Sequence, residues 1–400
     1  MASIARKNLL EDIPRFLVAQ AGIMFAVSLV TIQTGLQTGF AKSSSMLIDQ
    51  SRADIWVASE NMEHLALTQP IPYRRLAQAQ DVEGVAQAEA VIIQGVLWRQ
   101  PRLDRVASAT MIGALPNGLL FPLPGTPVRG NFSDLTDPYR ILIDQSSLKS
   151  LNLKDTGESG TINALPATVA GLTQGTKILV FDNLIFTSLR SANTYTNFRP
   201  TTGFNPTDKQ VIDAPDTPKA LAASDPITFI LVRAEPGQNL EDLKTRLNST
   251  LPYTRAYTRQ EMSQRTRDYW QERSGIGFIL GLGAAVGVIV GIVIVGQILY
   301  SSVSDHLKEF GTLKAMGASN WFIYRVIMEQ ALWMAILGYI PGVALCSGVA
   351  VWTATQGITI LITPTSALIV LGTTILMCFG SAVFAINKVT RVDPAIVFKS

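Results

Sequence analysis

Few residues of this sequence have the types and spacing that chemistry requires. The only two histidines, His64 and His306, lie far apart, and both cysteines, Cys346 and Cys378, sit inside apolar runs, so neither a metal cluster nor a disulfide framework is indicated. The motifs G-x-S-x-G, H-E-x-x-H and C-x-x-C, which mark hydrolases, metalloproteases and thiol redox proteins, do not occur. We therefore expect no catalytic residue, no metal site and no cofactor bound by this chain.

Three weaker signals have structural interpretations that we prefer. "GLTQGTK" (171–177) lacks the spacing of a phosphate-binding loop and is typical of a turn between strands. His64 follows Glu63 in a predicted loop, where a solvated or capping histidine is the favoured interpretation. Glu329 lies within an apolar run, four residues after Arg325, so a structural ion pair is favoured over a functional intramembrane acid.

A charged segment, "SDHLKEFGTLKAMGAS" (304–319), lies between two strongly apolar runs. A helical projection separates its apolar and polar residues: Leu307, Phe310, Leu313 and Met316 against Asp305, Lys308 and Thr312. Such a helix is suited to a membrane face or to a groove on a partner, and it has few Lys and Arg for a purely lipid-bound helix.

The elements that position this segment follow from the distribution of charge. Hydrophobic residues make up 48% of the chain and charged residues 16%, and no charged residue occurs in 16–41, 274–304 or 330–387. A helix needs about 20 apolar residues to cross a bilayer, so the sequence predicts four spans with a turn at 353–365. The spans lie at roughly 16–41, 275–301, 322–352 and 366–387.

The first span is polar for a membrane helix, which is typical of a helix buried against others. We expect it to be retained rather than cleaved as a signal peptide, because Gln33 and Gln37 stand where a small-residue cleavage site would be required. The formal net charge of +3 is too small to indicate a nucleic-acid partner.

Orientation is predicted from the basic residues that flank the spans. The outer turn 353–365 has no charge, whereas three other flanking segments carry Lys or Arg. These basic residues are Arg6, Lys7 and Arg15, then Lys308 and Lys314, and finally Lys388, Arg391 and Lys399. We therefore expect both termini and the segment 304–319 in the cytoplasm, with 42–274 outside.

The large region between the first two spans is predicted to be an α+β domain with helical, stalk-like ends. Strand patterns occur at 53–59, 90–98, 140–146, 177–182 and 227–235. Helices are expected at 71–80 and 239–249, the second with Asn239 as cap. The stretch 185–226 is rich in Pro, Thr and Asp and is predicted to be a long loop or insert.

Glycines in the second span form small-xxx-small patterns, at Gly277, Gly281, Gly283, Gly287 and Gly291. Such spacing lets helix backbones approach closely in a membrane. Packing within one chain and the seam of a homodimer explain it equally well.

The stretch "DHLKEFGTLKAMGAS" resembles the segment after the second span of FtsX-like permeases, the superfamily of the exporter permease MacB. The closing "VTRVDPAIVFK" is similar to that family's tail, and "YWQERSGIGFILGLGAAVGVIVGIVIVGQIL" resembles the DevC group of cyanobacterial exporter permeases. The resemblance implies a helical membrane protein of four transmembrane helices, with a large extracytoplasmic α+β (MacB-like periplasmic) domain inserted between helices 1 and 2. The implied parts are 1–41 with the first span, the outer domain 42–274, spans at 275–303, 320–352 and 366–387, a coupling helix at 304–319, the turn 353–365 and the tail 388–400.

In that family the segment after the second span couples the permease to a cytoplasmic ATPase. The resemblance assigns this role to Asp305, His306, Lys308, Glu309, Phe310, Gly311, Leu313, Lys314, Met316 and Gly317. It implies a non-catalytic permease subunit of an exporter, with ATP and Mg used by a separate DevA-like ATPase dimer.

The further partners that the resemblance implies are a second copy of the chain, a DevB/HlyD-like adaptor, a TolC-like outer-membrane channel and membrane lipids. The implied location is the inner membrane of a bacterium, in particular a cyanobacterium. Two alternatives stay open: extraction of lipid or lipoprotein from the membrane, and FtsX-like signalling to cell-wall hydrolases.

Overall fold

The computed structural model contains two compact units, one helical and one of mixed α and β structure. The first comprises Met1–Gly39 with Gly275–Ser400, and the second comprises Phe40–Ser274. The structure describes residues 13–100, 105–123, 125–178, 181–198, 215–273, 275–355 and 360–390.

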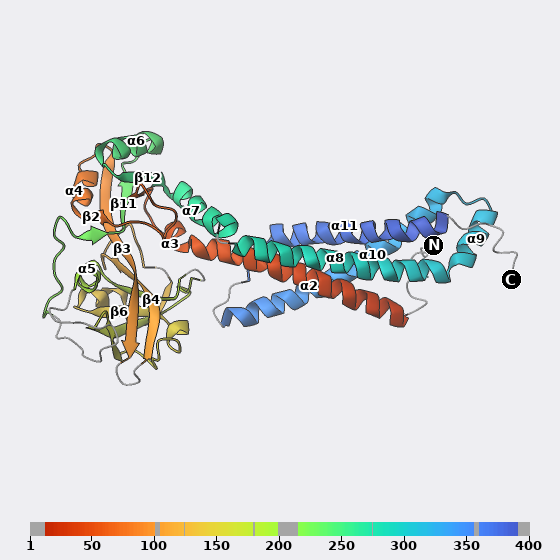
Figure 1. Ribbon diagram of the computed structural model, residues 1–400, viewed down its shortest axis with the longest axis horizontal. Coiled ribbons are helices and arrows are strands. Elements are labelled where there is room, and N and C mark those ends of the chain that lie inside the picture. Colours follow the sequence, from red (N-terminus) through yellow and green to blue (C-terminus); the bar gives the residue numbers. More distant parts are fainter. Residues whose placement is uncertain are drawn as a thin grey trace. The chain divides into compact units, whose positions relative to one another are not determined.

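Among the described residues, four helices of the helical unit are long and apolar enough to cross a membrane, which confirms the four predicted spans. They are α2 (Ile13–Ser44), α8 (Ile276–Asp305), α10 (Asn320–Thr355) and α11 (Pro364–Thr390). Figure 1 shows them running alongside one another. At about 1.5 Å per residue, a helix of 30 residues exceeds the ~30 Å hydrocarbon core.

Helix α2 packs closely on two of the other spans, α8 and α10. A Cβ on Gly22 of α2 would lie 2.4 Å from Ile294 of α8, and one on Gly338 of α10 would lie 2.5 Å from Ile23 of α2. The hydroxyls of Thr34 and Thr38 donate to carbonyls one turn earlier, at 2.8 and 2.9 Å. These threonines therefore satisfy their hydroxyls locally, within their own helix.

The mixed unit is built on a sheet that runs through the long strand β3 (Val85–Gln100). Its first half pairs with β11 (Phe229–Ala234), and β1 (Ile55–Ser59) and β12 (Thr254–Thr258) complete the antiparallel order β12-β1-β11-β3. Side chains of β1 alternate between two cores: Ile55 and Val57 belong to one buried cluster and Trp56 and Ala58 to the other. The sheet is therefore covered on both faces.

The second half of β3 belongs to a ring of six strands. Pairing runs from β3 through the five other strands and returns to β3, and only the β4–β9 and β6–β8 pairs are parallel. The five are, in order around the ring, β4 (Arg105–Ala114), β9 (Asn183–Ser188), β6 (Arg140–Asp144), β8 (Leu165–Gln174) and β7 (Ser159–Ile162). β5 (Thr126–Arg129) extends β8 at the edge, and β2 (Ile71–Pro72) pairs with β10 (Pro226–Ile227) outside the sheet.

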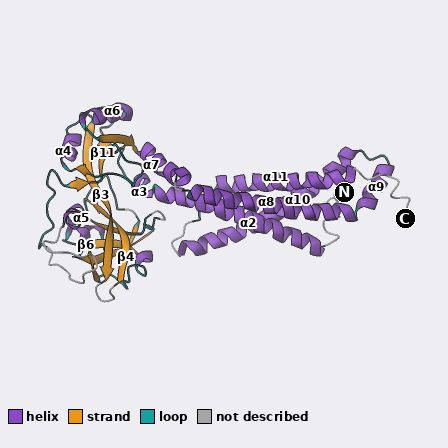
Figure 2. Cartoon of the chain, viewed as in Figure 1, coloured by secondary structure: helices purple, strands orange, loops and turns teal. Residues whose placement is uncertain are grey.

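Helices cover this sheet in the positions shown in Figure 2. α4 and α6 pack on the β3, β11 and β12 side, and α5 packs on β3, β4 and β9. Their bounds are α4 (Arg74–Gln80), α5 (Leu189–Asn197) and α6 (Leu240–Thr250). Two further helices of the unit, α3 (Met46–Asp49) and α7 (Arg259–Asp268), pack on each other. The predicted cap is confirmed, since the Asn239 side chain accepts from the Glu241 N–H at 2.9 Å.

Three sequence predictions for this unit are wrong. The described residues of 177–182 are not strand, and the strand is instead β9. The start of 185–226 is not loop, because it contains β9 and α5, whereas 199–214 lies outside the described residues. The predicted helix 71–80 begins only at Arg74, because Ile71–Pro72 form β2.

Candidate functional site: the short helix between two spans

The segment 304–319 is not one continuous helix. α8 ends at Asp305, and α9 (Leu307–Ala315) begins after His306, whose backbone (φ −94°, ψ 13°) is not helical. The carbonyl of His306 accepts from the Phe310 N–H at 3.1 Å, which starts the new helix. The side chains of Leu307 and Lys308 lie outside the described residues.

The end of α9 is equally well defined. Gly317 adopts φ +94°, a conformation that glycine accepts without strain, and its N–H donates to the Lys314 carbonyl at 3.0 Å. The Ala318 N–H donates to the Leu313 carbonyl at 2.9 Å, which completes a C-terminal cap. The Ser319 hydroxyl then accepts from the Phe322 N–H at 3.3 Å, so α10 starts at once.

Phe310 corrects the expected orientation of this helix. Only 3% of its surface is exposed, and it belongs to the buried cluster that includes Val303 of α8 and Ile327 of α10. The predicted contact between Phe310 and a partner surface is therefore wrong. The apolar side of α9 packs on the spans of its own chain, with Gly311 buried and Leu313 partly buried beside it.

The residues that face outward are polar, with one long apolar side chain. We define the α9 face as Asp305, Glu309, Thr312 and Met316, all of which are exposed. Met316 is 71% exposed, and Trp321 at the start of α10 is 77% exposed. His306 Nδ1 lies 3.2 Å from Glu309 Oε1, which orients that carboxylate. Met316 and the neighbouring Trp321 are of residue types enriched at protein interfaces, whereas the acidic groups of the face would lie at the rim of such an interface.

The glycines of the second span pack within the chain. A Cβ on Gly283, Gly287 or Gly291 would lie 2.6 Å from Gln33, 3.1 Å from Val30 or 2.1 Å from Met377 respectively. Gly281 has no atom within 4 Å of such a Cβ, and Gly277 is partly buried. Three of the five predicted glycines are thus used inside one chain.

Two other predictions have clear outcomes. Arg325 and Glu329 are both described, and no ion pair is formed between them, so that prediction is wrong. His64 is 4% exposed and its Nδ1 accepts from the Ala66 N–H at 3.2 Å, so it is a capping residue and not a solvated one. Across the described part of the chain, no group of three or more metal-ligating side chains is present.

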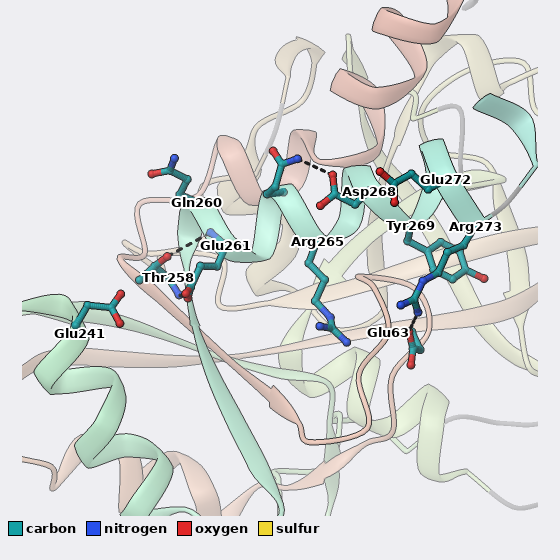
Figure 3. A pocket seen from close by; sticks show the side chains of 11 residues that line it. Glu63, Glu241, Thr258, Gln260, Glu261, Arg265, Asp268, Tyr269, Glu272 and Arg273 are labelled. Atoms are coloured by element: carbon teal, nitrogen blue, oxygen red, sulfur yellow. Dashed lines mark hydrogen bonds and ion pairs between the residues drawn. The ribbon is translucent and has the colours of Figure 1, made fainter. Parts of the chain in front are cut away.

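A groove of about 680 Å³ lies on the mixed unit, lined mainly by α7 and the residues that follow it (Figure 3). Its carboxylates are largely engaged within the protein. Glu63 pairs with Arg273 at 2.6 Å, and Asp268 accepts from Gln264 at 2.5 Å. Glu261 pairs with Lys244 at 2.8 Å, and hydrogen bonds from Lys244 and Thr258 lower the pKa of Glu261 against the opposing effect of burial, which raises it.

Two domain families match the chain. Residues 16–250 match the MacB-like periplasmic core domain, and residues 281–394 match the FtsX-like permease C-terminal domain. A relative with 27% identity over 130 residues is the macrolide export ATP-binding/permease protein MacB of Hyphomonas neptunium, where the match covers 32% of this chain and 20% of the relative. The chain thus matches about a fifth of that relative's length.

Two solved structures that the chain is similar to are extracytoplasmic regions of other proteins. The extracellular domain of the transporter YknZ from Gram-positive bacteria has TM-score 0.33 and 10% identity, covering 52% of this chain and 99% of that one. The periplasmic region of MacB from Actinobacillus actinomycetemcomitans has TM-score 0.32 and 12% identity, covering 52% and 90%.

Because the first match spans more than half of the chain, the chain belongs to the family with the MacB-like periplasmic core domain. Its second domain is of the FtsX-like permease type, and α9 lies within that match.

Proposed function

We propose that this chain is the permease subunit of an ATP-driven bacterial exporter, and that its α9 face docks on a separate cytoplasmic ABC ATPase. The observation that carries the proposal is the capped helix between two spans. Its apolar side is buried within the chain, while Glu309 and Met316 project outward. The match to the FtsX-like permease domain, which includes this helix, supports the proposal.

The packing of α9 supplies a route for force. Phe310 shares one buried cluster with Val295, Leu299 and Val303 of α8. Because protein interiors are close-packed, a push on α9 is passed to α8 rather than absorbed. ATP and Mg would be bound by the ATPase, and this chain would contribute motion and no catalytic group.

The proposal includes partners on the opposite side of the membrane. A second copy of the chain, a DevB/HlyD-like adaptor and a TolC-like channel would carry substrate outward, and the ATPase would be a DevA-like dimer. The flanking Lys and Arg residues support cytoplasmic termini. The resemblance to the DevC group supports the inner membrane of a cyanobacterium as the location.

No structural observation favours the two alternatives over export. Extraction of lipid would require an opening between α2 and α8, yet Gly283, Gly287 and Gly291 of α8 bring that helix against its neighbours, and the first two approach α2 directly. Signalling to a cell-wall hydrolase would use the same ATPase contact and would differ only in the outer partner.

The test is binding of a purified, co-expressed ABC ATPase to the full chain in nanodiscs. Met316→Asp places a charge where we expect an apolar pocket, and should weaken binding at least tenfold, equivalent to about 1.4 kcal/mol. Glu309→Lys should weaken it less, because a pair at the rim of an interface contributes little.

Thr373→Ala on α11 is the matched control, since its exposed hydroxyl donates only to the Ile369 carbonyl at 2.9 Å. If Met316→Asp and Thr373→Ala both leave binding and stimulated ATP turnover unchanged, the docking proposal is wrong.

A further inference from the structure

The segment that leads from α7 toward α8 contains a π-helical turn, Tyr269–Arg273. A π turn holds one residue more than an α turn, and such turns occur frequently at functional sites. None of its five residues is buried. The next bend is at Gly275, which caps α8 with φ +76°, and a Cβ added at this glycine would meet no atom within 4 Å.

The N-terminal end of this turn, at Tyr269, is held by stacked aromatic rings. The His64 ring lies nearly parallel to the Tyr269 ring, with centroids 4.0 Å apart and 29° between planes. Trp270 approaches His64 edge-on at 5.2 Å, and Phe40 approaches Trp270 edge-on at 5.6 Å. Aromatic rings favour such offset-stacked and edge-to-face arrangements, so these contacts restrain the first residues of the turn.

The C-terminal end of the turn, at Arg273, is held by Glu63, the residue immediately before His64. Arg273 Nη1 lies 2.6 Å from Glu63 Oε2, and the two side chains are 67% and 43% exposed. Figure 3 shows Arg273 reaching Glu63 beside the ring of Tyr269. Two consecutive residues, Glu63 and His64, therefore contact the last and first residues of one five-residue turn.

The loop that carries these two residues is itself ordered. The Leu67 N–H donates to the His64 carbonyl and the Glu63 N–H donates to the Leu67 carbonyl, both at 3.0 Å. Burial lowers the pKa of His64 to about 4, against the opposing effect of Glu63, so the ring is neutral near pH 7 and stacks as an uncharged aromatic.

The two sides of the turn are held differently. Before it, α7 is fixed to the mixed unit: Ser263 Oγ donates to Asp49 Oδ1 at 2.5 Å, and Arg265 donates to the Met62 carbonyl at 3.0 Å. Beside it, Tyr269, Glu272 and Arg273 line the groove of about 680 Å³. Side chains of α7 border the same groove, but Met262, Ser263 and Thr266 of α7 are buried, whereas no residue of the turn is buried.

We propose that Tyr269–Arg273 is a conformational switch between π-helical and α-helical winding. Contacts with Glu63 and His64 keep the surplus residue within the π turn. On release, the turn rewinds as α-helix and moves the surplus residue beyond Arg273. A shift of one residue rotates the following backbone by about 100°, because an α-helix has 3.6 residues per turn. The switch does not depend on which partner the chain serves.

The experiment measures amide hydrogen exchange of the full chain in nanodiscs. His64→Ala removes the stack and should speed exchange across 269–273 by about tenfold, whereas His64→Phe keeps a ring and should stay within about twofold of wild type. Exchange in β1 and β11 should not change in either variant. The switch is excluded if His64→Ala has no effect, if His64→Phe matches it, or if exchange rises throughout the unit.

Deletion of Gln271 removes the surplus residue and provides an independent check. The shortened turn should exchange like α7, and adding His64→Ala to the deletion should change its exchange by less than about twofold, because no surplus residue is left to hold. A full tenfold effect of His64→Ala in the deletion background would overturn the proposal. So would a deletion variant whose turn exchanges faster than wild type while β1 and β11 stay protected.

Discussion

The two short helical segments that flank α8 in the sequence are held by opposite means. α9, after α8, is anchored by Phe310, which is 3% exposed, and closed by a left-handed glycine at its end. The turn Tyr269–Arg273, before α8, has no buried residue and depends on ring stacking and one exposed ion pair. Segments anchored in a core open less readily than segments held by surface contacts. We therefore expect α9 to move as a rigid part of the helical unit and the π turn to change conformation more easily.

The largest expected effect comes from the rigid segment. Phe310→Ala empties a buried site, and such truncations cost about 3–5 kcal/mol of folding free energy. Met316→Ala, at a position that is 71% exposed, should leave stability unchanged and serves as the control. Thermal unfolding of the full chain in detergent measures both, and equal melting temperatures would show that Phe310 is not a core residue.

The second effect concerns helix packing behind α9. Gly291→Leu would force a Cβ to within 2.1 Å of Met377 and 3.0 Å of Ala26, so we expect loss of several kcal/mol or failure to assemble. Gly281→Leu meets no atom within 4 Å and should be tolerated by the single chain.

Size-exclusion chromatography of both glycine variants distinguishes helix packing within one chain from a homodimer interface along α8. A Gly281→Leu variant that folds but no longer pairs would place a copy-to-copy seam at that glycine. A stable, native Gly291→Leu variant would contradict the packing of α8 on α11 and α2.

The spans could be predicted from the sequence alone, because long runs without charged residues are the direct signature of helices that cross a bilayer. It missed β4 and β8, since "RVASATMIGA" and "LPATVAGLTQ" contain several Ala and Gly residues, and the second a Pro, which weaken strand propensity. Conversely, "KILVFD" has strong propensity, yet Ile178 is buried in an irregular segment where tertiary packing decides the outcome. Strand order could not be read from any local pattern.

The short helix between the second and third spans was predicted correctly, but its apolar side faces its own chain rather than outward. A helical projection finds the apolar side of α9, but an apolar side packs equally well on its own chain or on a partner. Only the contact of Phe310 with the buried cluster of α8 and α10 resolves this. The π turn has no sequence signal at all, because its surplus residue depends on the loop that carries His64, some 205 positions earlier than Tyr269 in the chain.

The third effect is a dependence of folding stability on pH, caused by His64 beside the π turn. His64 has a pKa of about 4 in the folded chain, against an ordinary value of 6.5, so unfolding takes up a proton between these pH values. Stability is complete above pH 6.5 and falls as pH decreases toward 4, by on the order of 3 kcal/mol at most.

His64→Phe has no proton to take up and should flatten this part of the profile. Denaturant unfolding of the mixed unit between pH 7 and 4 measures the difference. The explanation fails if wild type and His64→Phe lose stability in parallel.

The smallest effect is expected at the exposed ion pair. Glu63→Gln removes the charge partner of Arg273, and exposed pairs contribute about 0–1 kcal/mol. Exchange across 269–273 should rise only about two- to fivefold, less than for His64→Ala. If Glu63→Gln exceeds His64→Ala, the ion pair and not the ring stack is the main restraint on the turn.

Site-specific photo-crosslinking tests the docking proposal most directly. A benzophenone attached to Met316→Cys, in membranes that contain the co-expressed ABC ATPase, should crosslink the chain to that ATPase. The same probe at Asp242→Cys, an exposed position of α6, should not, and the native Cys346 and Cys378 are buried and contribute little background. An ATPase adduct at position 316 and none at 242 is the predicted result. An ATPase adduct at 242, or none at 316 while the complex is intact, would contradict the account.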